Sequence, residues 1–348
     1  MPITLTSLSD LAALGFDDII DVRAPSEYDD DHLPGAISLP VLDDAERARV
    51  GTIYKQVSPF SARKIGAALV ARNAARHIEG PLADRDGGWR PLVYCWRGGQ
   101  RSGSFATILR QIGWRVETID GGYKAWRGLV VRALYDDPWP MPVRVLDGNT
   151  GTAKTEILNL LPERGVQVID LEGLAHHRGS VFGALGPQPS QRAFECRLAM
   201  ALSALDPSRP VVVEAESAKV GDCRVPPALW TAMKEAPRVT IAAPPEARAR
   251  YLARAYADVT ADPDRLVRII EALRAYQPAD RIDLWCGMAT AGHWERLAHE
   301  LMLHHYDARY ARHRKRMPEA GATVPADTLD PGALPALADR VAKAVATR

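Results

Sequence analysis

The chain has 348 residues, of which 47% are hydrophobic and 25% are charged, a composition that excludes a disordered or fibrous protein. Its 44 Lys and Arg residues balance 43 Asp and Glu residues, which excludes a generally basic nucleic-acid-binding face and leaves local patches as the route to a polyanion. No apolar run approaches the roughly 18 residues that cross a bilayer, and the first residues do not resemble a secretory signal. We therefore expect a cytoplasmic protein with no membrane segment.

Short β-rich runs alternate with helical stretches in the first part of the chain. The patterns predict strands over 18–22, 92–94 and 116–119, and helices over 62–75 and 102–112. This alternation is typical of a parallel sheet with crossover helices. We expect an α/β domain over residues 1–135.

A cysteine follows the second of these strands where a helix begins. It opens the loop Cys95-Trp96-Arg97-Gly98-Gly99-Gln100-Arg101. Backbone amides and the positive end of the helix stabilise a thiolate at this place, and Arg97 and Arg101 add cationic charge. Cys95, Arg97 and Arg101 are therefore the candidate catalytic residues. The remaining cysteines lie far apart without a C-x-x-C pair and are expected to pack as small hydrophobic residues.

A proline-rich segment separates two patterned regions. Pro138, Pro140 and Pro142 remove backbone donors and stiffen the chain, and we place a linker over 136–142. Strands are then predicted over 144–147, 166–170, 211–214 and 239–241, and the sequence from Pro245 onward is mostly helical. The second domain, over 143–348, is expected to be an α/β domain with a helical C-terminal part. The length of the chain fits two domains.

A glycine-rich loop joins the strand 144–147 to a helical run over 156–161. Its residues are Gly148, Asn149, Thr150, Gly151, Thr152, Ala153, Lys154 and Thr155. In a Walker A loop, backbone amides cradle phosphates, the lysine reaches terminal oxygens and the hydroxyl is a magnesium ligand. Thr155 is thus the candidate metal ligand. Ala153 replaces the second glycine of the motif, and a backbone conformation costly for a residue with Cβ would distort the loop.

Two acidic residues follow the buried strand 211–214. Glu214 and Glu216 resemble a Walker B element, which orients magnesium or a base. Ligands bind at the carboxyl ends of strands in open α/β sheets. These two carboxylates are therefore candidates for the phosphate site, and a carboxylate that merely ends a buried strand is the alternative interpretation.

Several motifs resemble known families. Asp21-Val22-Arg23, Glu27, His32-Leu33-Pro34-Gly35-Ala36 and Asp120-Gly121-Gly122-Tyr123 resemble the rhodanese homology domain. Together with a P-loop domain in this order, they make the chain similar over nearly its full length to the bacterial tRNA 2-selenouridine synthases. Further segments carry this resemblance: 171–180, 188–195, 214–217, and His305-Tyr306-Asp307 with Tyr310.

The resemblance implies a transferase that modifies tRNA in two steps. The family alkylates the sulfur of wobble 2-thiouridine with a geranyl group from geranyl diphosphate, and then replaces the geranylthio group by selenium from selenophosphate. The phosphate loop would hold the diphosphate, and Cys95 would serve the selenium step as a perselenide carrier or as a nucleophile. Both donors are co-substrates, magnesium is the candidate ion, and no tightly bound cofactor is expected. The implied partners are tRNA and an enzyme that supplies selenophosphate.

Two polar segments are candidates for RNA contact. His176 and His177 lie in a loop after a strand, and with the family resemblance the neighbouring Arg178 is a candidate for a diphosphate or tRNA contact. Near the C-terminus, aromatic residues that can stack on bases accompany the densest basic run: Tyr306, Tyr310, Arg312, Arg314 and Arg316. A solvated helix face is the alternative interpretation of this run.

Two other functions remain open from the residues alone. The C-x5-R spacing from Cys95 to Arg101 also occurs in cysteine phosphatases and arsenate reductases, and is one residue longer than in sulfur-transferring rhodaneses. A rhodanese-fold enzyme of that class with a nucleotide-binding appendage is the first alternative, although Tyr94 stands where such enzymes usually have histidine. A non-catalytic nucleotide-binding scaffold is the second. The replacement of the second motif glycine by Ala153 favours this second interpretation, whereas the intact Cys95 loop argues against it.

Overall fold

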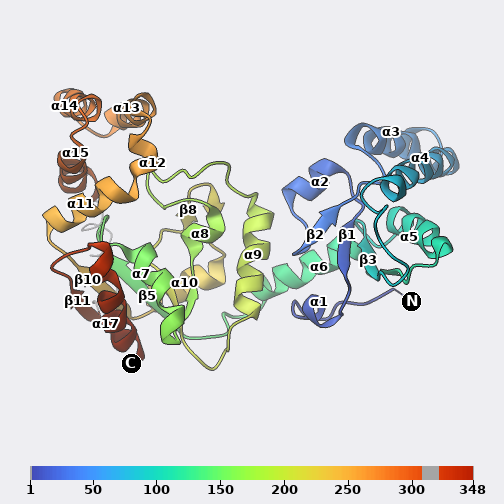
Figure 1. The fold of residues 1–348 in the computed structure, drawn as a ribbon, viewed down its shortest axis with the longest axis horizontal. Coiled ribbons are helices and arrows are strands. Elements are labelled where there is room, and N and C mark those ends of the chain that lie inside the picture. Colours follow the sequence, from blue (N-terminus) through green and yellow to red (C-terminus); the bar gives the residue numbers. More distant parts are fainter. Residues whose placement is uncertain (1, 308–320, 348) are drawn as a thin grey trace. The chain divides into compact units, whose positions relative to one another are not determined.

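The computed structural model describes residues 2–307 and 321–347. The chain forms two compact units (Figure 1): unit 1 contains Met1–Asp137 with Pro189–Ala204, and unit 2 contains Pro138–Gln188 with Leu205–Arg348. A parallel sheet lies in each unit, and helices follow it near the C-terminus, so the predicted fold class is confirmed. Within the described ranges, no helix is both long enough and apolar enough to span a bilayer.

Unit 1 is built on a four-stranded parallel sheet with the strand order β2-β1-β3-β4. The strands are β1 (Asp18–Asp21), β2 (Ala36–Ser38), β3 (Pro91–Tyr94) and β4 (Glu117–Thr118). Every residue of β3 is buried, as expected for an apolar strand between two neighbours with helices on the faces of the sheet. The segment that follows β3 therefore starts from a rigid inner strand.

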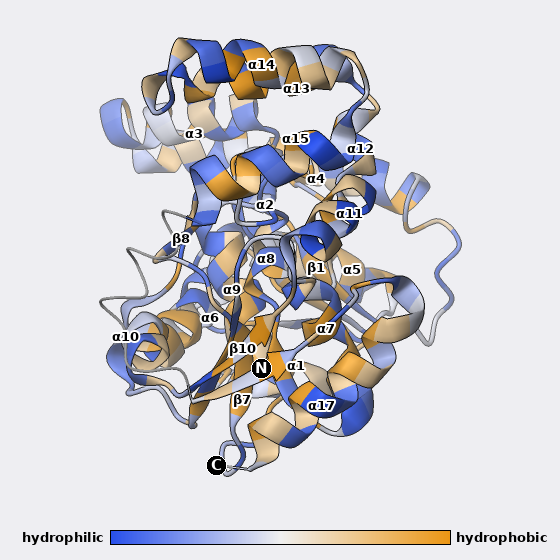
Figure 2. Cartoon of the chain, turned by 90° about the vertical axis from the view of Figure 1, so that its left-hand side faces the viewer, coloured by the Kyte–Doolittle hydropathy of each residue, from blue (hydrophilic) through white to orange (hydrophobic). Residues whose placement is uncertain are grey.

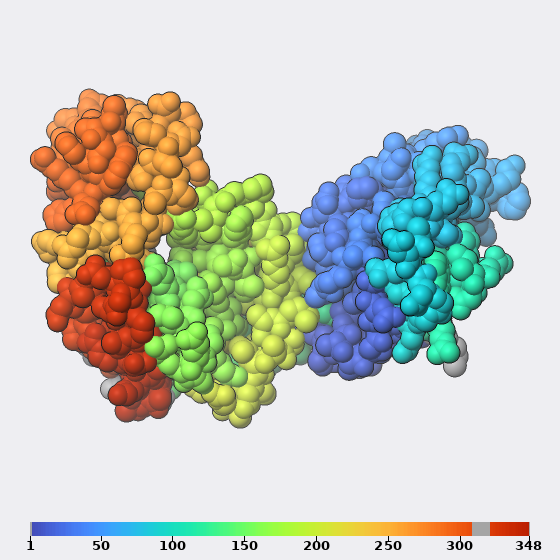
Figure 3. Space-filling view, viewed as in Figure 1, coloured from blue at the N-terminus to red at the C-terminus, as the bar shows by residue number. Residues whose placement is uncertain are grey.

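The helices of unit 1 are α1 (Asp10–Ala13), α2 (Pro25–Asp30), α3 (Asp44–Gln56), α4 (Pro59–Glu79), α5 (Gln100–Ile112), α6 (Gly122–Val131) and α9 (Gln191–Ser203). A core cluster joins the sheet to α4 and α5 through Ile20, Val93, Leu69 and Phe105. Helix α3 begins at a capping box between Asp43 and Glu46 and contains no buried residue. Figure 3 shows the side chains of α3 and α4 along an outer edge of this unit.

Helix α9 lies between β6 and β7 in the sequence but packs with α6 in unit 1. The indole Nε1 of Trp126 donates to the Cys196 sulfur at 3.4 Å. The buried Glu195 carboxylate pairs with Arg127 and accepts a hydrogen bond from the Tyr135 hydroxyl. These contacts combine apolar packing with a satisfied buried charge.

Unit 2 contains a five-stranded parallel sheet with the order β11-β10-β5-β7-β6, and a separate antiparallel pair. The strands are β5 (Val143–Gly148), β6 (Gln167–Ile169), β7 (Val211–Glu214), β10 (Arg238–Ala242) and β11 (Ala322–Pro325), and the pair is β8 (Lys219–Val220) with β9 (Cys223–Arg224). Figure 2 shows β7 and β10 in orange among helices of mixed colour. Strand β11 departs from the expected helical region, because this short edge strand lacks a distinctive pattern.

The helices of unit 2 are α7 (Lys154–Leu160), α8 (Leu171–Ala175), α10 (Pro227–Glu235), α11 (Pro245–Ala255), α12 (Ala257–Thr260), α13 (Pro263–Glu271), α14 (Ala279–Thr290), α15 (Trp294–Leu301) and α17 (Leu334–Ala346), with a π-helical turn η4 (Met302–Tyr306). Helix α17 joins the core over the sheet. Helices α13 to α15 enclose a second core around Ile282, Trp285 and Leu297. The unit therefore has a sheet layer and a helical subdomain.

Candidate functional site

Cys95 lies in the turn between β3 and α5 in unit 1. Its side chain is 3% exposed, and the Ser102 hydroxyl donates to the sulfur at 3.2 Å. Among the described residues, no hydrogen bond uses the amide N–H groups of residues 96–99 as donors. These amides can therefore bind an oxyanion or a chalcogen next to the sulfur.

The loop around Cys95 is fixed by the start of α6. The carbonyls of Cys95 and Trp96 accept hydrogen bonds from the amides of Tyr123 and Lys124 at 2.8 and 3.0 Å. Gly122 has φ +56°, and a Cβ there would lie 2.2 Å from the Cys95 carbonyl oxygen. The Asp120-Gly121-Gly122-Tyr123 motif thus acts by letting two backbone segments approach closely.

A cavity over the sulfur brings the predicted residues together. It is lined by Ser26, Glu27, Asp30, Arg47, Cys95, Trp96, Arg97, Gly99, Gln100, Arg101 and Arg192. Arg101 pairs with Glu27 at 2.7 Å, and Arg47 reaches the same carboxylate at 3.0 Å. Burial disfavours ionisation of Glu27, but the hydrogen bond and charge of Arg101 hold its pKa below the ordinary value. The surplus of arginines favours an anionic ligand.

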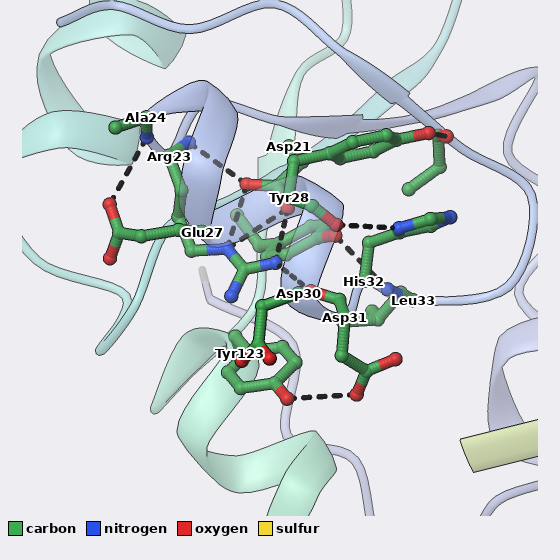
Figure 4. A network of polar contacts seen from close by, with 12 residues as sticks. Asp21, Arg23, Ala24, Glu27, Tyr28, Asp30, Asp31, His32, Leu33 and Tyr123 are labelled. Carbon is green, nitrogen blue, oxygen red and sulfur yellow. Dashed lines mark hydrogen bonds and ion pairs between the residues drawn. The ribbon is translucent and has the colours of Figure 1, made fainter. Parts of the chain in front are cut away.

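A buried polar network supports this cavity (Figure 4). Arg23 is 1% exposed, pairs with Asp21 at 2.6 Å and donates to the Asp31 carbonyl oxygen at 2.5 Å. Its guanidinium lies 4.0 Å from the Tyr123 ring centroid, and the Tyr123 hydroxyl donates to the Asp31 carboxylate at 2.8 Å. Because each buried charge is partnered, the network can hold α2 and α6 in fixed positions.

Tyr94, the residue before Cys95, is an anchor in the core. It is fully buried, and its hydroxyl oxygen accepts a hydrogen bond from the Leu33 amide at 3.1 Å. Burial raises the pKa of Tyr94 well above its ordinary value, so the phenol stays neutral. This residue does not provide the acid-base group that a histidine would provide at the same position.

The phosphate loop of unit 2 follows β5 and leads into α7. Lys154 Nζ donates to the Gly148 carbonyl oxygen at 2.8 Å. Arg248 Nε donates to the Thr150 carbonyl oxygen at 2.9 Å and the same guanidinium pairs with Asp307 at 2.7 Å. Asp307, from the His305-Tyr306-Asp307 segment, therefore helps to position the loop through Arg248. Sequence reasoning missed Arg248, which no local motif marks.

Ala153 adopts the conformation that its side chain disfavours. Its φ is +59° and ψ +26°, in the left-handed region, where a residue with Cβ pays about 1 kcal/mol relative to right-handed backbone. The side chain is 2% exposed and packs in the core beside Ile157. Helix α7 nonetheless begins at the next residue. The replacement therefore strains the loop without removing the helix that follows it.

Acidic side chains converge beside the loop. Thr155 Oγ1 donates to Glu172 at 2.6 Å, and the Glu172 amide donates to the Glu214 carboxylate at 2.7 Å. Burial raises the pKa of Glu214 well above its ordinary range. Burial and the neighbouring Glu172 raise the pKa of Glu216 to about 8. Sequence reasoning did not select Glu172, although its position after β6, next to β7 in the sheet, marks the same ligand-binding edge.

The side-chain oxygens of Thr155, Glu172 and Glu216 match the ligand preference of magnesium. Within 2–307 and 321–347, no three His, Cys, Asp or Glu side chains form a group that could hold a metal ion. Magnesium at phosphate sites usually takes only one or two carboxylates and completes its shell with water and phosphate. The Thr155 hydroxyl with Glu172 and Glu216 fits that pattern.

The raised pKa of Glu216 predicts a pH effect on stability. The pKa of Glu216 is near 4.5 in the unfolded chain and about 8 in the folded protein. Between these two pH values, the Glu216 carboxyl keeps its proton in the folded protein and loses it in the unfolded chain. The contribution of Glu216 to the free energy of unfolding is therefore present at low pH and is lost as the pH rises through about 8. Thermal melts across this range should show a falling Tm for the wild type and a smaller fall for Glu216→Gln. Parallel curves for the two proteins would contradict the assignment.

The predicted polar loop contributes to the phosphate cavity. His177 and Arg178 line it, whereas His176 is exposed and its ring contacts the Pro187 carbonyl. Arg178 pairs with Asp258 at 2.9 Å, and its buried Nη1 has no hydrogen-bond partner among the described residues. That unused donor is available to an anion. Tyr310, Arg312, Arg314 and Arg316 lie outside the described residues.

An apolar cavity adjoins the phosphate cavity in unit 2. Thr150, Ser180, Leu252, Tyr256 and Tyr306 line both. The remainder of the second cavity is formed mainly by apolar side chains: Phe182, Val259, Leu266, Trp294, Leu297, Ala298, Leu301 and Met302. An anion cradle next to a hydrocarbon-lined cavity matches a ligand with a charged head and an apolar chain.

Comparison with known proteins identifies both modules. The family model described as tRNA 2-selenouridine synthase AAA domain matches residues 141–274, and the rhodanese-like domain model matches residues 4–129. The tRNA 2-selenouridine synthase of Aeromonas salmonicida is 39% identical over 254 residues, 71% of this chain and 67% of that protein. The Shewanella denitrificans and Pseudomonas syringae pv. syringae proteins of the same name are 37% and 40% identical, over 69% and 66% of this chain and 65% and 64% of their own lengths.

Proposed function

The chain belongs to the tRNA 2-selenouridine synthase family, and we propose that it converts 2-thiouridine in tRNA to 2-selenouridine through an S-geranyl intermediate. Geranyl diphosphate would supply the alkyl group and selenophosphate the selenium. Unit 2 would carry out alkylation, and unit 1 would serve the selenium step. Each donor would thus bind at its own anion site, geranyl diphosphate in unit 2 and selenophosphate in unit 1.

The observation that carries this proposal is the junction of the two cavities in unit 2. A diphosphate at Lys154 and Arg178 would leave its alkyl chain beside Leu252 and Tyr256, where the apolar cavity begins. Each buried methylene group stabilises binding by about 0.8 kcal/mol. A nucleotide would instead place a polar ribose and base against this surface. The geometry thus favours a prenyl diphosphate over a nucleoside triphosphate.

Alkylation requires stabilisation of the departing diphosphate. The thiouridine sulfur attacks the first carbon of the geranyl group as the carbon–oxygen bond to diphosphate breaks. Lys154 and the unused Arg178 donor can neutralise the charge that develops on the leaving oxygen. Magnesium bound at Thr155 and the neighbouring carboxylates would supply additional positive charge. Alkylation makes the sulfur a better leaving group for the second step.

The selenium step would take place over Cys95. The amides of residues 96–99 with Arg97 and Arg101 form a site for the phosphate group of selenophosphate. Cys95 would act there as a nucleophile: its thiolate attacks the carbon that bears the sulfur and expels geranylthiolate. The selenium of selenophosphate then displaces Cys95 from that carbon, and water cleaves the selenium–phosphorus bond to release phosphate.

A substitution that fills the apolar cavity tests the donor assignment. Ala298 lines that cavity and not the phosphate cavity. We expect Ala298→Phe to weaken binding of geranyl diphosphate at least about tenfold, because the ring occupies the space of several methylene groups. Binding of inorganic diphosphate should be unchanged. Calorimetric titration with both ligands, and with ATP as a comparison, measures this. Equal losses for both diphosphates, or tighter binding of ATP than of geranyl diphosphate, would contradict the proposal.

A further inference from the structure

The hairpin formed by α3 and α4 in unit 1 carries more basic than acidic residues, and its acids, Asp44, Glu46 and Glu79, lie at the start of α3 and the end of α4. From Arg47 to Ile78 the sequence contains no Asp or Glu, although the whole chain is nearly neutral. The basic residues of this stretch are all exposed: Arg47, Arg49, Lys55, Arg63, Lys64, Arg72 and Arg76. Arg47 pairs with Glu27, whereas Arg49, Lys55 and Lys64 have no carboxylate partner among the described residues. The hairpin is therefore a concentrated cationic surface.

Large apolar side chains are exposed where the two helices meet. Tyr54 is 56% exposed, Val57 74% and Phe60 72%. They lie at the end of α3, in the connection, and in the first turn of α4. Because each of them is more than half exposed, these side chains do not belong to the core of the described unit. Aromatic rings beside lysines provide stacking faces within a cationic surface.

A groove connects this surface to the cysteine site. The groove is lined by Val50, Tyr54, Arg63, Gly66, Gln100 and Arg101, among other residues. Gln100 and Arg101 also line the cavity over Cys95. Helices α3 and α4 pack together, and α4 packs on α5 (Figure 1). A strand of nucleic acid that follows the groove from Tyr54 would reach the entrance to the cysteine cavity.

We propose that the α3–α4 hairpin binds the single-stranded loop of the RNA substrate and directs the modified base toward Cys95. The inference rests on the proposed function, from which it takes RNA as the substrate. Charge complementarity selects this occupant, because the hairpin exposes seven Lys and Arg residues and has no Asp or Glu between Arg47 and Ile78. Tyr54 and Phe60 would stack on unpaired bases while the lysines contact phosphates.

Charge reversal at Lys55 and Lys64 tests the electrostatic part. The double variant Lys55→Glu/Lys64→Glu should bind labelled tRNA at least about tenfold more weakly than the wild type, with a salt slope smaller by about 0.7 for each lost phosphate contact. The control Arg340→Glu/Lys343→Glu makes the same change of net charge on exposed positions of α17. It should behave as the wild type. Equal losses in both variants would indicate a general charge effect and overturn the proposal.

Substitutions at Phe60 test base stacking. This side chain is highly exposed, so its replacement leaves the core intact. Phe60→Leu should weaken binding of an RNA stem-loop containing 2-thiouridine about tenfold, whereas Phe60→Trp should retain affinity because it preserves a stacking face. Equal binding by Leu and Trp variants at the wild-type level would overturn the stacking role.

The outcomes also separate this inference from the proposed function. If wild-type protein binds the RNA and performs the reaction while all hairpin variants bind it normally, the hairpin inference fails and the proposed function stands. If the variants keep RNA affinity but lose selenium transfer from a donor protein, the surface binds that protein instead, and the inference is overturned. If the wild type binds neither tRNA nor the stem-loop, both proposals fail.

Discussion

Cys95→Ser is expected to abolish selenium incorporation into tRNA while S-geranylation continues. The substitution removes the sulfur that lines the cavity over the 96–99 amides, and a serine hydroxyl is a far weaker nucleophile at neutral pH. The phosphate loop and the apolar cavity belong to unit 2 and are unaffected. We expect at least about a 1000-fold loss in the selenium step, as found when nucleophiles are removed. Mass spectrometry of tRNA nucleosides should show S-geranyl-2-thiouridine accumulating.

Cys286→Ser is the matched control for this prediction. Cys286 lies in unit 2, and burial raises the pKa of its thiol, with the charge of Glu271 acting in the same direction, so it is a poor candidate for thiolate chemistry. Its replacement should leave both products unchanged. Loss of both products in Cys95→Ser, with tRNA binding intact, would show that the two steps are not divided between the units as proposed.

Lys154→Ala is expected to reduce geranylation at least about 100-fold. The substitution removes a cation that lines the phosphate cavity and contacts the Gly148 carbonyl, and stabilisation of a leaving diphosphate depends on such charges. A rate series with increasing geranyl diphosphate separates the effect on KM from the effect on kcat. Loss of ground-state binding raises KM, whereas loss of transition-state stabilisation lowers kcat.

Two comparisons make the Lys154 result specific. Lys343→Ala changes an exposed lysine on α17 and should leave geranylation unchanged. When tRNA that already carries the S-geranyl group is supplied, Lys154→Ala should incorporate selenium at the wild-type rate. A normal geranylation rate in Lys154→Ala would place the alkyl donor elsewhere, and a loss of selenium incorporation from the pre-alkylated tRNA would indicate a shared site.

The sequence predicted those parts of the site that are continuous in the chain. Strand, turn and helix follow one another at Cys95 and at Lys154, so local patterns were sufficient to find both loops. Arg248 reaches the phosphate loop from a distant helix, and the apolar cavity is assembled from several helices of unit 2. Such contacts depend on tertiary packing, which local periodicity does not encode. Strand β11 escaped prediction for a related reason, because its edge position leaves little sequence signal.

The packing of α9 with α6 has a consequence for biosynthesis. Glu195 and Cys196, which contact α6 and its neighbours, are translated after β5, α7 and β6 of the other unit. At usual elongation rates, the interval between Asp137 and Ala204 is on the order of seconds. The nascent chain must therefore begin unit 2 before it can finish unit 1. A fragment that stops at Asp137 would leave Trp126 and Arg127 without these partners, so an isolated N-terminal module needs residues 189–204 supplied separately or joined by a redesigned connection.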